Sequence, residues 1–238
     1  MELKGTTAVI TGASAGIGAA VAEALHAKGA NLVLCGQRED VLAERAAKLG
    51  NAHFVAGDLV DPGVAQRLID TALQAYGGCD IVINNAGIMT AGAIDDIDLD
   101  LTCRMMRVNI EAGVRVMYTA LRHFRKAGRG HLITTGSVLG TKVRPFSGAY
   151  SATKYALEAL TESFRLELAG TGIRVGIVEP GLTITELHRD WEKTPAQMRG
   201  LKEAILPEDV ARCVMFMLET PGHVYVPRLM LLPGDDEI

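Results

Sequence analysis

The sequence of 238 residues lacks the features that mark several specialised classes of protein. Its four cysteines are scattered, with no C-x-x-C pair and no histidine at zinc-ligand spacing, so neither a disulfide framework nor a metal site is expected. No apolar run reaches the ~20 residues that a membrane helix needs. The amino-terminal residues run directly into an apolar segment without a signal-peptide pattern. We therefore expect a cytoplasmic protein with reduced thiols, no metal and no membrane contact.

An excess of charge of one sign is also lacking. The formal net charge is -4 and the pI is about 5.9, which gives none of the basic character typical of proteins that bind nucleic acid. No proline-rich, serine-rich or like-charge stretch suggests a linker, and the length suffices for one large core. The sequence thus predicts a single domain, residues 1–238, without a nucleic-acid partner.

Short apolar runs alternate with amphipathic stretches of helical period, a pattern typical of βαβ units around a buried parallel sheet. Strands are expected at residues 6–11, 31–36, 52–57, 80–84, 131–135, 173–179 and 224–231. Helices are expected at residues 17–28, 39–49, 62–76, 99–126, 149–169 and 207–219. The sequence therefore predicts an α/β fold, a doubly wound domain with a seven-stranded parallel sheet and helices on both faces. The irregular residues 185–206 are interpreted as a substrate lid.

A glycine-rich turn, TGASAGIG at residues 11–18, joins the first expected strand to the first helix. Gly12 can form the tight turn, Gly16 lets a pyrophosphate approach the backbone, and Gly18 allows close packing of helix and strand. Phosphates would meet free N–H groups at the positive end of the helix. The turn indicates a dinucleotide site, and a glycine-rich turn without a ligand is the alternative.

The end of the second strand indicates which dinucleotide is preferred. An acid at this place binds the ribose 2′-hydroxyl of NAD, but the strand ends at Gly36 and continues with Gln37 and Arg38. The missing side chain leaves room for a 2′-phosphate, which Arg38 could pair with and to which Ser14 and Gln37 could donate hydrogen bonds. This favours NADP(H) over NAD(H). The alternative is that Arg38 is a surface charge that opens a helix.

Tyr150 and Lys154 are four residues apart and share one face of an expected helix, and Ser137 closes the strand before it. A phenol titrates near pH ~10, too high for efficient proton exchange at neutral pH. A nearby ammonium favours the phenolate and lowers this pKa. The pair therefore suggests acid/base chemistry on a carbonyl, although chance alone often supplies such a spacing.

Other polar residues follow the central strands. Asp58 comes after the third strand, and Asn84-Asn85-Ala86-Gly87 ends the fourth, which suits adenine recognition and a cofactor that crosses close to the backbone. Asp58 could equally shape a local turn. Asn109 lies inside the longest helical pattern, where asparagine is a poor helix former, and local hydrogen bonding to the backbone is its alternative role.

Taken in order, these motifs resemble the short-chain dehydrogenase/reductase family over essentially the whole chain, including Pro180-Gly181 after the sixth strand. The resemblance implies a catalytic tetrad of Asn109, Ser137, Tyr150 and Lys154. Tyr150 would transfer the proton and Ser137 would hydrogen-bond the substrate oxygen. Lys154 would lower the pKa of the tyrosine and hold the nicotinamide ribose, and Asn109 would position a water in a proton relay.

The resemblance also implies a cofactor site and a substrate pocket. In the loop after the sixth strand, Thr183 would meet the nicotinamide carboxamide through its backbone and Thr185 would lie near the phosphates. The expected cofactor-binding residues are Gly12, Ser14, Ala15, Gly16, Ile17, Gly18, Gly36, Gln37, Arg38, Asp58, Leu59, Asn85, Ala86, Gly87, Tyr150, Lys154, Pro180, Gly181, Thr183 and Thr185. The expected pocket residues are Ser137, Leu139, Arg144, Phe146, Leu182 and Trp191.

The sequence departs from the family pattern at two places. Members that use NADP often have arginine directly after the position of Gly36, whereas this chain has Gln37 before Arg38. Many members end in an Asp-Gly-Gly strand, whereas residues 227–234 read PRLMLLPG. That ending resembles a branch of NADP-dependent enzymes that act on small 3-hydroxy acids, serine-like substrates and aldehydes.

We therefore expect an NADP(H)-dependent oxidoreductase that transfers a hydride between nicotinamide and a carbonyl or secondary alcohol, as a carbonyl reductase or alcohol dehydrogenase. A 3-oxoacyl thioester reductase is the alternative within enzymes. A non-catalytic NADP(H)-sensing protein is the alternative of another class. The family often assembles through its long helices, here residues 99–126 and 149–169, so a homo-oligomer, either a tetramer or a dimer, is expected.

Overall fold

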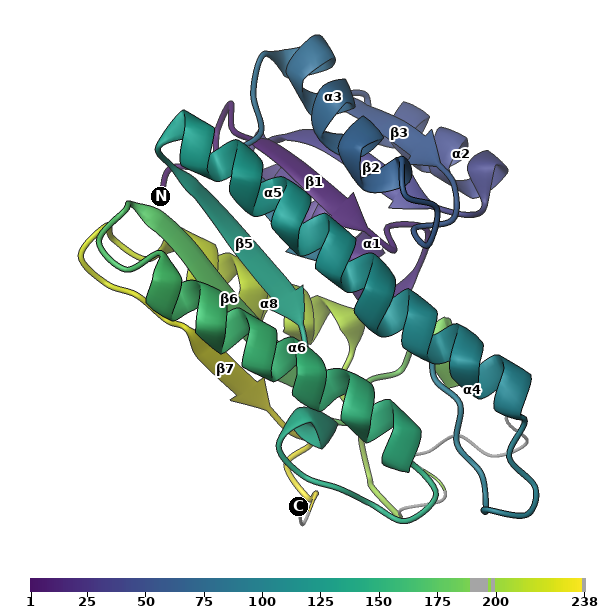
Figure 1. The fold of residues 1–238 in the computed structure, drawn as a ribbon. Coiled ribbons are helices and arrows are strands. Elements are labelled where there is room, and N and C mark those ends of the chain that lie inside the picture. Colours follow the sequence, from purple (N-terminus) through teal and green to yellow (C-terminus); the bar gives the residue numbers. More distant parts are fainter. Residues whose placement is uncertain (189–196, 198–199, 237–238) are drawn as a thin grey trace.

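A parallel β-sheet forms the middle layer of the molecule (Figure 1). The computed structural model describes residues 1–188, 197 and 200–236. Within these residues the sheet has seven strands in the order β3-β2-β1-β4-β5-β6-β7, and all neighbouring strands are parallel. The strands are β1 (Thr7–Thr11), β2 (Asn31–Gly36), β3 (Ala52–Ala56), β4 (Ile81–Asn84), β5 (Gly130–Thr135), β6 (Ile173–Pro180) and β7 (Arg228–Leu231).

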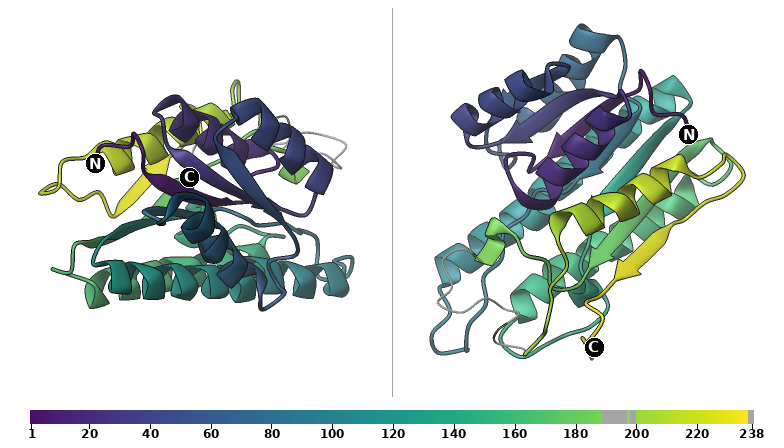
Figure 2. Two further views of the ribbon diagram at one scale, coloured as in Figure 1. Left: turned by 90° about the horizontal axis from the view of Figure 1, so that it is seen from above. Right: turned by 180° about the vertical axis from the view of Figure 1, so that it is seen from behind.

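Helices cover both faces of this sheet, as the view from above shows (Figure 2). One face carries α3 (Val64–Tyr76), α5 (Gly113–Ala127) and α6 (Gly148–Glu167). The other face carries α1 (Gly16–Ala27), α2 (Glu39–Leu49) and α8 (Pro207–Glu219). The predicted doubly wound α/β fold is confirmed. None of the described helices is both long and apolar enough to cross a membrane.

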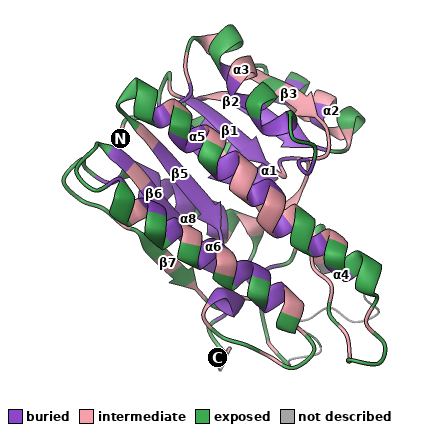
Figure 3. Cartoon of the chain, viewed as in Figure 1, coloured by how far each residue is buried: buried purple, intermediate pink, exposed green. Residues whose placement is uncertain are grey.

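The central strands are mostly apolar and are buried on both faces, whereas the edge strands β3 and β7 are partly exposed (Figure 3). Successive side chains of a strand point to opposite faces. In β2, Leu32 and Leu34 accordingly join the core under α1, α2 and α8, and Val33 and Cys35 join the core under α3, α5 and α6. Two separate cores thus fix the sheet between the helical layers.

The order of the strands places a crevice at the centre of the sheet. From β1 the chain proceeds to β2 on one side, and from β4 it proceeds to β5 on the other, although β1 and β4 are neighbours. Connections that leave in opposite directions open a crevice beyond the carboxyl ends of the strands. Thr11 and Asn84, the last residues of β1 and β4, lie at this point.

The helix predicted at residues 99–126 is present and contains a π-helical turn. It consists of α4 (Leu99–Met106), a π-helical turn η1 (Arg107–Ala112) and α5. Asn109 lies in the middle of the π-turn and is only 2% exposed. π-turns insert an extra residue into a helix and often occur at functional sites. The helix predicted from the sequence is therefore present, and only its π-helical turn was not indicated by the sequence pattern.

The last strand is shorter than the predicted residues 224–231, because β7 begins only at Arg228. Pro227 precedes it and has no amide hydrogen to donate to the sheet, although its carbonyl accepts a hydrogen bond from Ile177 N (2.9 Å). Strand pairing with β6 therefore starts after the proline.

The segment between β6 and α8, in which a lid was expected at residues 185–206, is described in part. Its two ends are joined, because Ile184 N donates to Ile205 O (2.8 Å) and Ile205 N donates to Leu182 O (3.0 Å). A 3₁₀ helix, η3 (Glu186–His188), follows Thr185. Trp191 lies outside the described residues, so the lid remains a prediction.

Candidate active site

The carboxyl ends of the strands open into a cleft of about 1550 Å³. Of the expected cofactor-binding residues, all except Gly18 line this cleft, and so do Ser137, Leu139, Arg144, Phe146 and Leu182 of the expected substrate pocket. Residues from seven separate segments of the sequence are thereby brought to one cavity. Gly18 and Asn109 do not line the cleft, but they contact residues that do.

The glycine-rich turn has a backbone that only glycine adopts easily. Gly12 and Gly16 have φ angles of 68° and 55°, in the left-handed region. A Cβ at Gly18 would stand 2.7 Å from Asn85 Nδ2 and 2.8 Å from the Gly12 carbonyl carbon. Helix α1 begins here without a side-chain cap and without an acid in its first turn. Its amino end can therefore accept an anion from the cleft.

Thr11 and Asn85 hold the floor of the cleft together. Thr11 Oγ1 accepts hydrogen bonds from Asn85 N (2.9 Å) and Ala86 N (3.0 Å) and donates to Ile83 O (3.3 Å). Asn85 Nδ2 donates to Thr11 O (3.0 Å), and Thr135 Oγ1 donates to Asn85 Oδ1 (3.0 Å). These bonds fix the ends of β1, β4 and β5 relative to one another.

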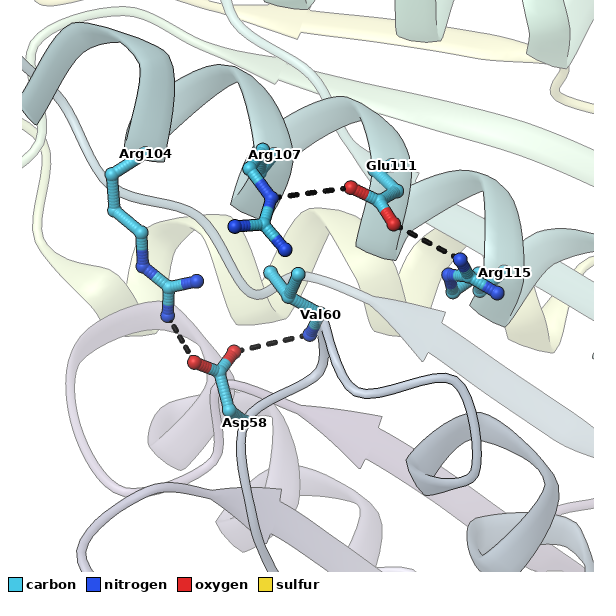
Figure 4. Close-up of polar contacts among 6 residues, drawn as sticks. All are labelled: Asp58, Val60, Arg104, Arg107, Glu111 and Arg115. Atoms are coloured by element: carbon cyan, nitrogen blue, oxygen red, sulfur yellow. Dashed lines mark hydrogen bonds and ion pairs between the residues drawn. The ribbon is translucent and has the colours of Figure 1, made fainter. Parts of the chain in front are cut away.

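Asp58 is held by an arginine from a distant helix (Figure 4). Its carboxylate forms an ion pair with Arg104 of α4, and its other oxygen accepts a hydrogen bond from Val60 N (3.0 Å). Arg104 also lines the cleft. Asp58 thus shapes a local turn, as in the alternative interpretation, and also lines the cleft. No local sequence pattern could have indicated Arg104.

Arg38 lies at the end of β2 next to the glycine-rich turn. Its Nη2 donates to Ser14 Oγ (3.2 Å) and lies 2.8 Å from Glu186 Oε2. A Cβ at Gly36 would stand 3.3 Å from Ser14 Oγ. The absence of a side chain at Gly36 therefore keeps the hydroxyl and the guanidinium accessible from the cleft, as the sequence predicts for a 2′-phosphate site.

Ser137, Tyr150 and Lys154 form a buried corner of the cleft, with exposed fractions of 8%, 8% and 5%. Lys154 Nζ donates to Thr135 O (2.9 Å) and lies 5.7 Å from the centroid of the Tyr150 ring. Ser137 Oγ accepts from Leu139 N (3.1 Å) at the start of the 3₁₀ helix η2 (Val138–Gly140) and also forms a hydrogen bond with Tyr150. The structure therefore brings these three predicted residues together.

Burial shifts the pKa values of the pair toward the neutral forms. It raises the pKa of Tyr150 to about 12, against a smaller lowering by the hydrogen bond with Ser137. It lowers the pKa of Lys154 to about 8, against a smaller raising by Glu158. The sequence predicts that Lys154 lowers the pKa of Tyr150, whereas within the chain alone the loss of solvent around the phenol dominates. Tyr150 is a protonated phenol at neutral pH.

Asn109 uses its side chain to anchor the loop after β4. Its Oδ1 accepts from Ile88 N (2.9 Å), and its Nδ2 donates to Ile88 O (2.9 Å) and to Thr153 Oγ1 (3.2 Å). Both amide hydrogens are thereby used, so the side chain has none to donate to a water. This agrees with the alternative of backbone hydrogen bonding, and it links the π-turn to helix α6.

A buried acidic pair lies one helical turn behind Lys154. Arg228 contacts the carboxyl groups of Glu158 and, at 3.2 Å, of Glu179, whose side chain has no exposed surface. Burial, and then Glu158, raises the pKa of Glu179 to about 8. The spacing of four residues between Lys154 and Glu158 could have indicated their shared helix face. The contacts with Glu179 and Arg228 have no local sequence signal.

The substrate side of the cleft is partly described. Phe146 is 66% exposed and has a φ of 68°, which is unusual for a residue with a side chain. Arg144 Nη2 lies 3.8 Å from Asp236 Oδ1 near the end of the chain. An anionic group therefore already faces this arginine. Trp191, the remaining expected pocket residue, is outside the described residues.

Comparisons with known proteins agree with this arrangement. The profile of the short chain dehydrogenase family matches residues 6–196. An uncharacterized oxidoreductase of Staphylococcus aureus is 36% identical over 228 residues, which cover 95% of this chain and 96% of that protein.

Solved structures with the same fold carry nicotinamide cofactors. A short chain dehydrogenase from Burkholderia cenocepacia in complex with NADP has 33% identity and a TM-score of 0.85, over 98% of this chain and 99% of that one. A 3-ketoacyl-(acyl-carrier-protein) reductase from Brucella melitensis complexed with NADH has 25% identity and a TM-score of 0.88, over 98% of each chain. The closed form of a serine dehydrogenase complexed with NADP+ has a TM-score of 0.92 at 24% identity, over 98% of this chain and 97% of that one, and shows the shared fold.

Proposed function

This chain belongs to the short-chain dehydrogenase family, and we propose that it is an NADP(H)-dependent oxidoreductase that interconverts carbonyl compounds and secondary alcohols. The observation that carries the proposal is the buried corner of Ser137, Tyr150 and Lys154 in the same cleft as the glycine-rich turn. A dinucleotide on the turn and a substrate at the corner would share one solvent-poor space.

The buried corner supplies proton transfer and charge stabilisation. A bound nicotinamide supplies or accepts the hydride. In the reductive direction Tyr150, a neutral phenol at pH 7, donates its proton to the carbonyl oxygen of the substrate. Ser137 donates a hydrogen bond to the same oxygen and stabilises the negative charge that develops on it. The ammonium of Lys154 stabilises the tyrosine oxygen after the proton has left.

The preference for NADP(H) is supported by the end of β2. Gly36 offers no acid to a ribose 2′-hydroxyl, and Arg38 and Ser14 present a guanidinium and a hydroxyl on the cleft side. A guanidinium binds phosphate oxygens in a charge-assisted, often bidentate way. The similar short chain dehydrogenase from Burkholderia cenocepacia carries NADP, and the reductase from Brucella melitensis carries NADH.

A second candidate function is reduction of a 3-oxoacyl group attached to a carrier protein. It is favoured by the likeness to the 3-ketoacyl-(acyl-carrier-protein) reductase, and the same three residues could serve it. Rates that saturate with an acyl carrier protein, while free small ketones react slowly, would support this candidate. Equal or faster rates with free small carbonyl compounds would exclude it.

We also propose that the protein forms a homo-oligomer through α5 and α6. Their outer surfaces carry large apolar side chains that are 43–60% exposed, namely Tyr118, Tyr155 and Leu166. Light scattering measures the mass directly. A monomer at concentrations well above those of the assay would contradict the proposal.

The function is tested by following NADPH oxidation over a panel of aldehydes, 2- and 3-keto acids, diketones and cyclic ketones, with NADH in parallel. The matched control is Tyr150→Phe, which removes the proton donor and keeps the ring in the buried corner. We expect it to slow turnover about 10²- to 10⁴-fold while NADPH binding, followed by cofactor fluorescence, changes little.

Near-normal turnover by Tyr150→Phe on an accepted substrate would refute the role of the tyrosine. NADPH binding without oxidation on any member of the panel would instead favour a nucleotide-sensing protein. An absence of NADPH binding would contradict the function as a whole.

A further inference from the structure

The guanidinium of Arg38 is shared between two segments that are far apart in the sequence. Its Nη2 lies 2.8 Å from Glu186 Oε2 and donates to Ser14 Oγ at 3.2 Å. Ser14 belongs to the glycine-rich turn, whereas Glu186 is the first residue of η3, in the segment that follows β6. All three residues line the cleft.

The carboxylate of Glu186 therefore occupies a place that suits an anion of the cofactor. It contacts the same guanidinium nitrogen that donates to Ser14 Oγ, and a Cβ at Gly36 would stand 3.3 Å from that hydroxyl. Carboxylates and phosphates use the same N–H donors of an arginine. A 2′-phosphate bound by Arg38 and Ser14 would meet the carboxylate at the same donors.

The residue before Glu186 ties this contact to the phosphate-binding turn. A Cβ at Gly16 would stand 3.3 Å from Thr185 Cγ2, so Thr185 lies directly against the turn. Leu187 N donates to Thr185 Oγ1 (3.3 Å) and holds the start of η3 in this position. The segment of residues 185–187 thus crosses the turn and ends on Arg38.

The ion pair is of a kind that another anion can replace. The side chains of Arg38 and Glu186 are 40% and 49% exposed, so solvent screens their attraction. A phosphate carries more negative charge than a carboxylate and competes well for an arginine. NAD(H) has a hydroxyl at the same place and cannot make this exchange.

We propose that Glu186 is a specificity-determining residue that competes with the 2′-phosphate of NADP(H) for Arg38. Binding of NADP(H) exchanges one anion on the guanidinium for another, and the affinity for the phosphorylated cofactor includes the cost of displacing or repelling the carboxylate. NAD(H) binds with this contact in place. The proposal rests on the proposed function only in that NADP(H) is the ligand.

The experiment is isothermal titration calorimetry on the full chain with NADP+, NAD+, adenosine 2′,5′-bisphosphate and 5′-AMP. We expect Glu186→Gln to tighten the binding of NADP+ and of the bisphosphate about two- to fivefold, the effect of one screened ion pair. Binding of NAD+ and 5′-AMP should not change. In an Arg38→Gln background, Glu186→Gln should have a smaller effect, because the residue for which both anions compete is gone and only the repulsion between the carboxylate and the phosphate remains.

The matched control is Glu39→Gln, which removes the same charge from an exposed residue next to Arg38 in the sequence. It should leave all four affinities within experimental error. Equal tightening of NADP+ and NAD+ by Glu186→Gln, the same effect from Glu39→Gln, or no effect at all would overturn the role of Glu186. Failure of the unaltered protein to bind NADP+ would instead contradict the proposed function, so the two failures are distinguishable.

Discussion

Gly18 packs directly against the carbonyl group of Gly12, and a Cβ at Gly18 would stand 2.8 Å from the carbonyl carbon of Gly12. The contact joins the first turn of α1 to the end of β1 at the bottom of the cleft. This contact explains why position 18 needs a glycine although the residue does not line the cleft.

Gly18→Ala should weaken both the fold and nucleotide binding. The added methyl would also meet Asn85 Nδ2 at 2.7 Å, so helix α1 has to shift away from the turn. Overpacking of this kind costs about 1–3 kcal/mol. Urea denaturation and NADP+ titration measure the two effects. Gly78→Ala, whose methyl meets nothing within 4 Å, serves as the control and should match the unaltered protein.

Thr11→Val should destabilise the protein although the two side chains have nearly the same shape. The valine cannot accept the hydrogen bonds from Asn85 N and Ala86 N. A buried donor without a partner costs about 1–3 kcal/mol, so the two donors together should lower the free energy of unfolding by about 2–6 kcal/mol. Thr11→Ser keeps the hydroxyl and should therefore retain most of the free energy of unfolding that Thr11→Val loses. Equal losses in both variants would contradict this role of the hydroxyl, because only Thr11→Ser keeps the hydrogen-bond acceptor.

Lys154→Met should impair cofactor binding and turnover together. Methionine fills much of the space of the lysine stem but removes the charge and the hydrogen bond to Thr135 O. We expect a loss of about 10²-fold or more in kcat/KM, measured with NADPH on an accepted substrate. Lys142→Met, at an exposed position after η2, is the control. Retention of both cofactor affinity and rate in Lys154→Met would contradict the role given to Lys154.

Glu179→Gln should change how stability depends on pH. Burial raises the pKa of Glu179 from 4.5 to about 8, so between these values the folded protein keeps a proton that the unfolded chain releases. This contribution to stability is fully present below about pH 4.5 and is lost as the pH rises through about 8. Glutamine has nearly the shape of the protonated carboxyl group and no proton to release.

The variant cannot ionise, so its stability relative to the unaltered protein should increase from pH 5 to pH 9. Urea denaturation across this range measures the difference, and Glu167→Gln, at an exposed position, should show no such trend. A difference that is constant with pH would mean that the carboxyl of Glu179 keeps an ordinary pKa.

The fold was predictable because its signals are local. Runs such as Thr7–Thr11 and Asn31–Gly36 are mostly apolar, and the stretches between them have helical period. The glycine-rich turn and the Tyr150/Lys154 spacing are likewise contained within eight residues or fewer. Each of these features could be located before any tertiary contact was known.

The contacts that determine charge in the site were not predictable, because they join distant segments. Arg104 pairs with Asp58, Glu186 with Arg38, and Arg228 with both Glu158 and Glu179. Each pair depends on how strands, helices and connections that are distant in the sequence pack together, which no short pattern encodes. The raised pKa of Tyr150 was not predictable for the same reason, because its burial depends on helices and strands that are distant in the sequence.

The π-turn at Arg107–Ala112 rotates the side chains of α5 about the helix axis relative to those of α4. Successive residues of an α-helix are offset by about 100°, so the extra residue turns every side chain of α5 by that angle relative to α4. Helix α4 can thus direct Arg104 toward Asp58 while α5 keeps Val116 and Phe124 against the sheet. A deletion of one residue within this turn would restore a regular helix. Arg104 could then no longer face Asp58 while Val116 and Phe124 pack against the sheet.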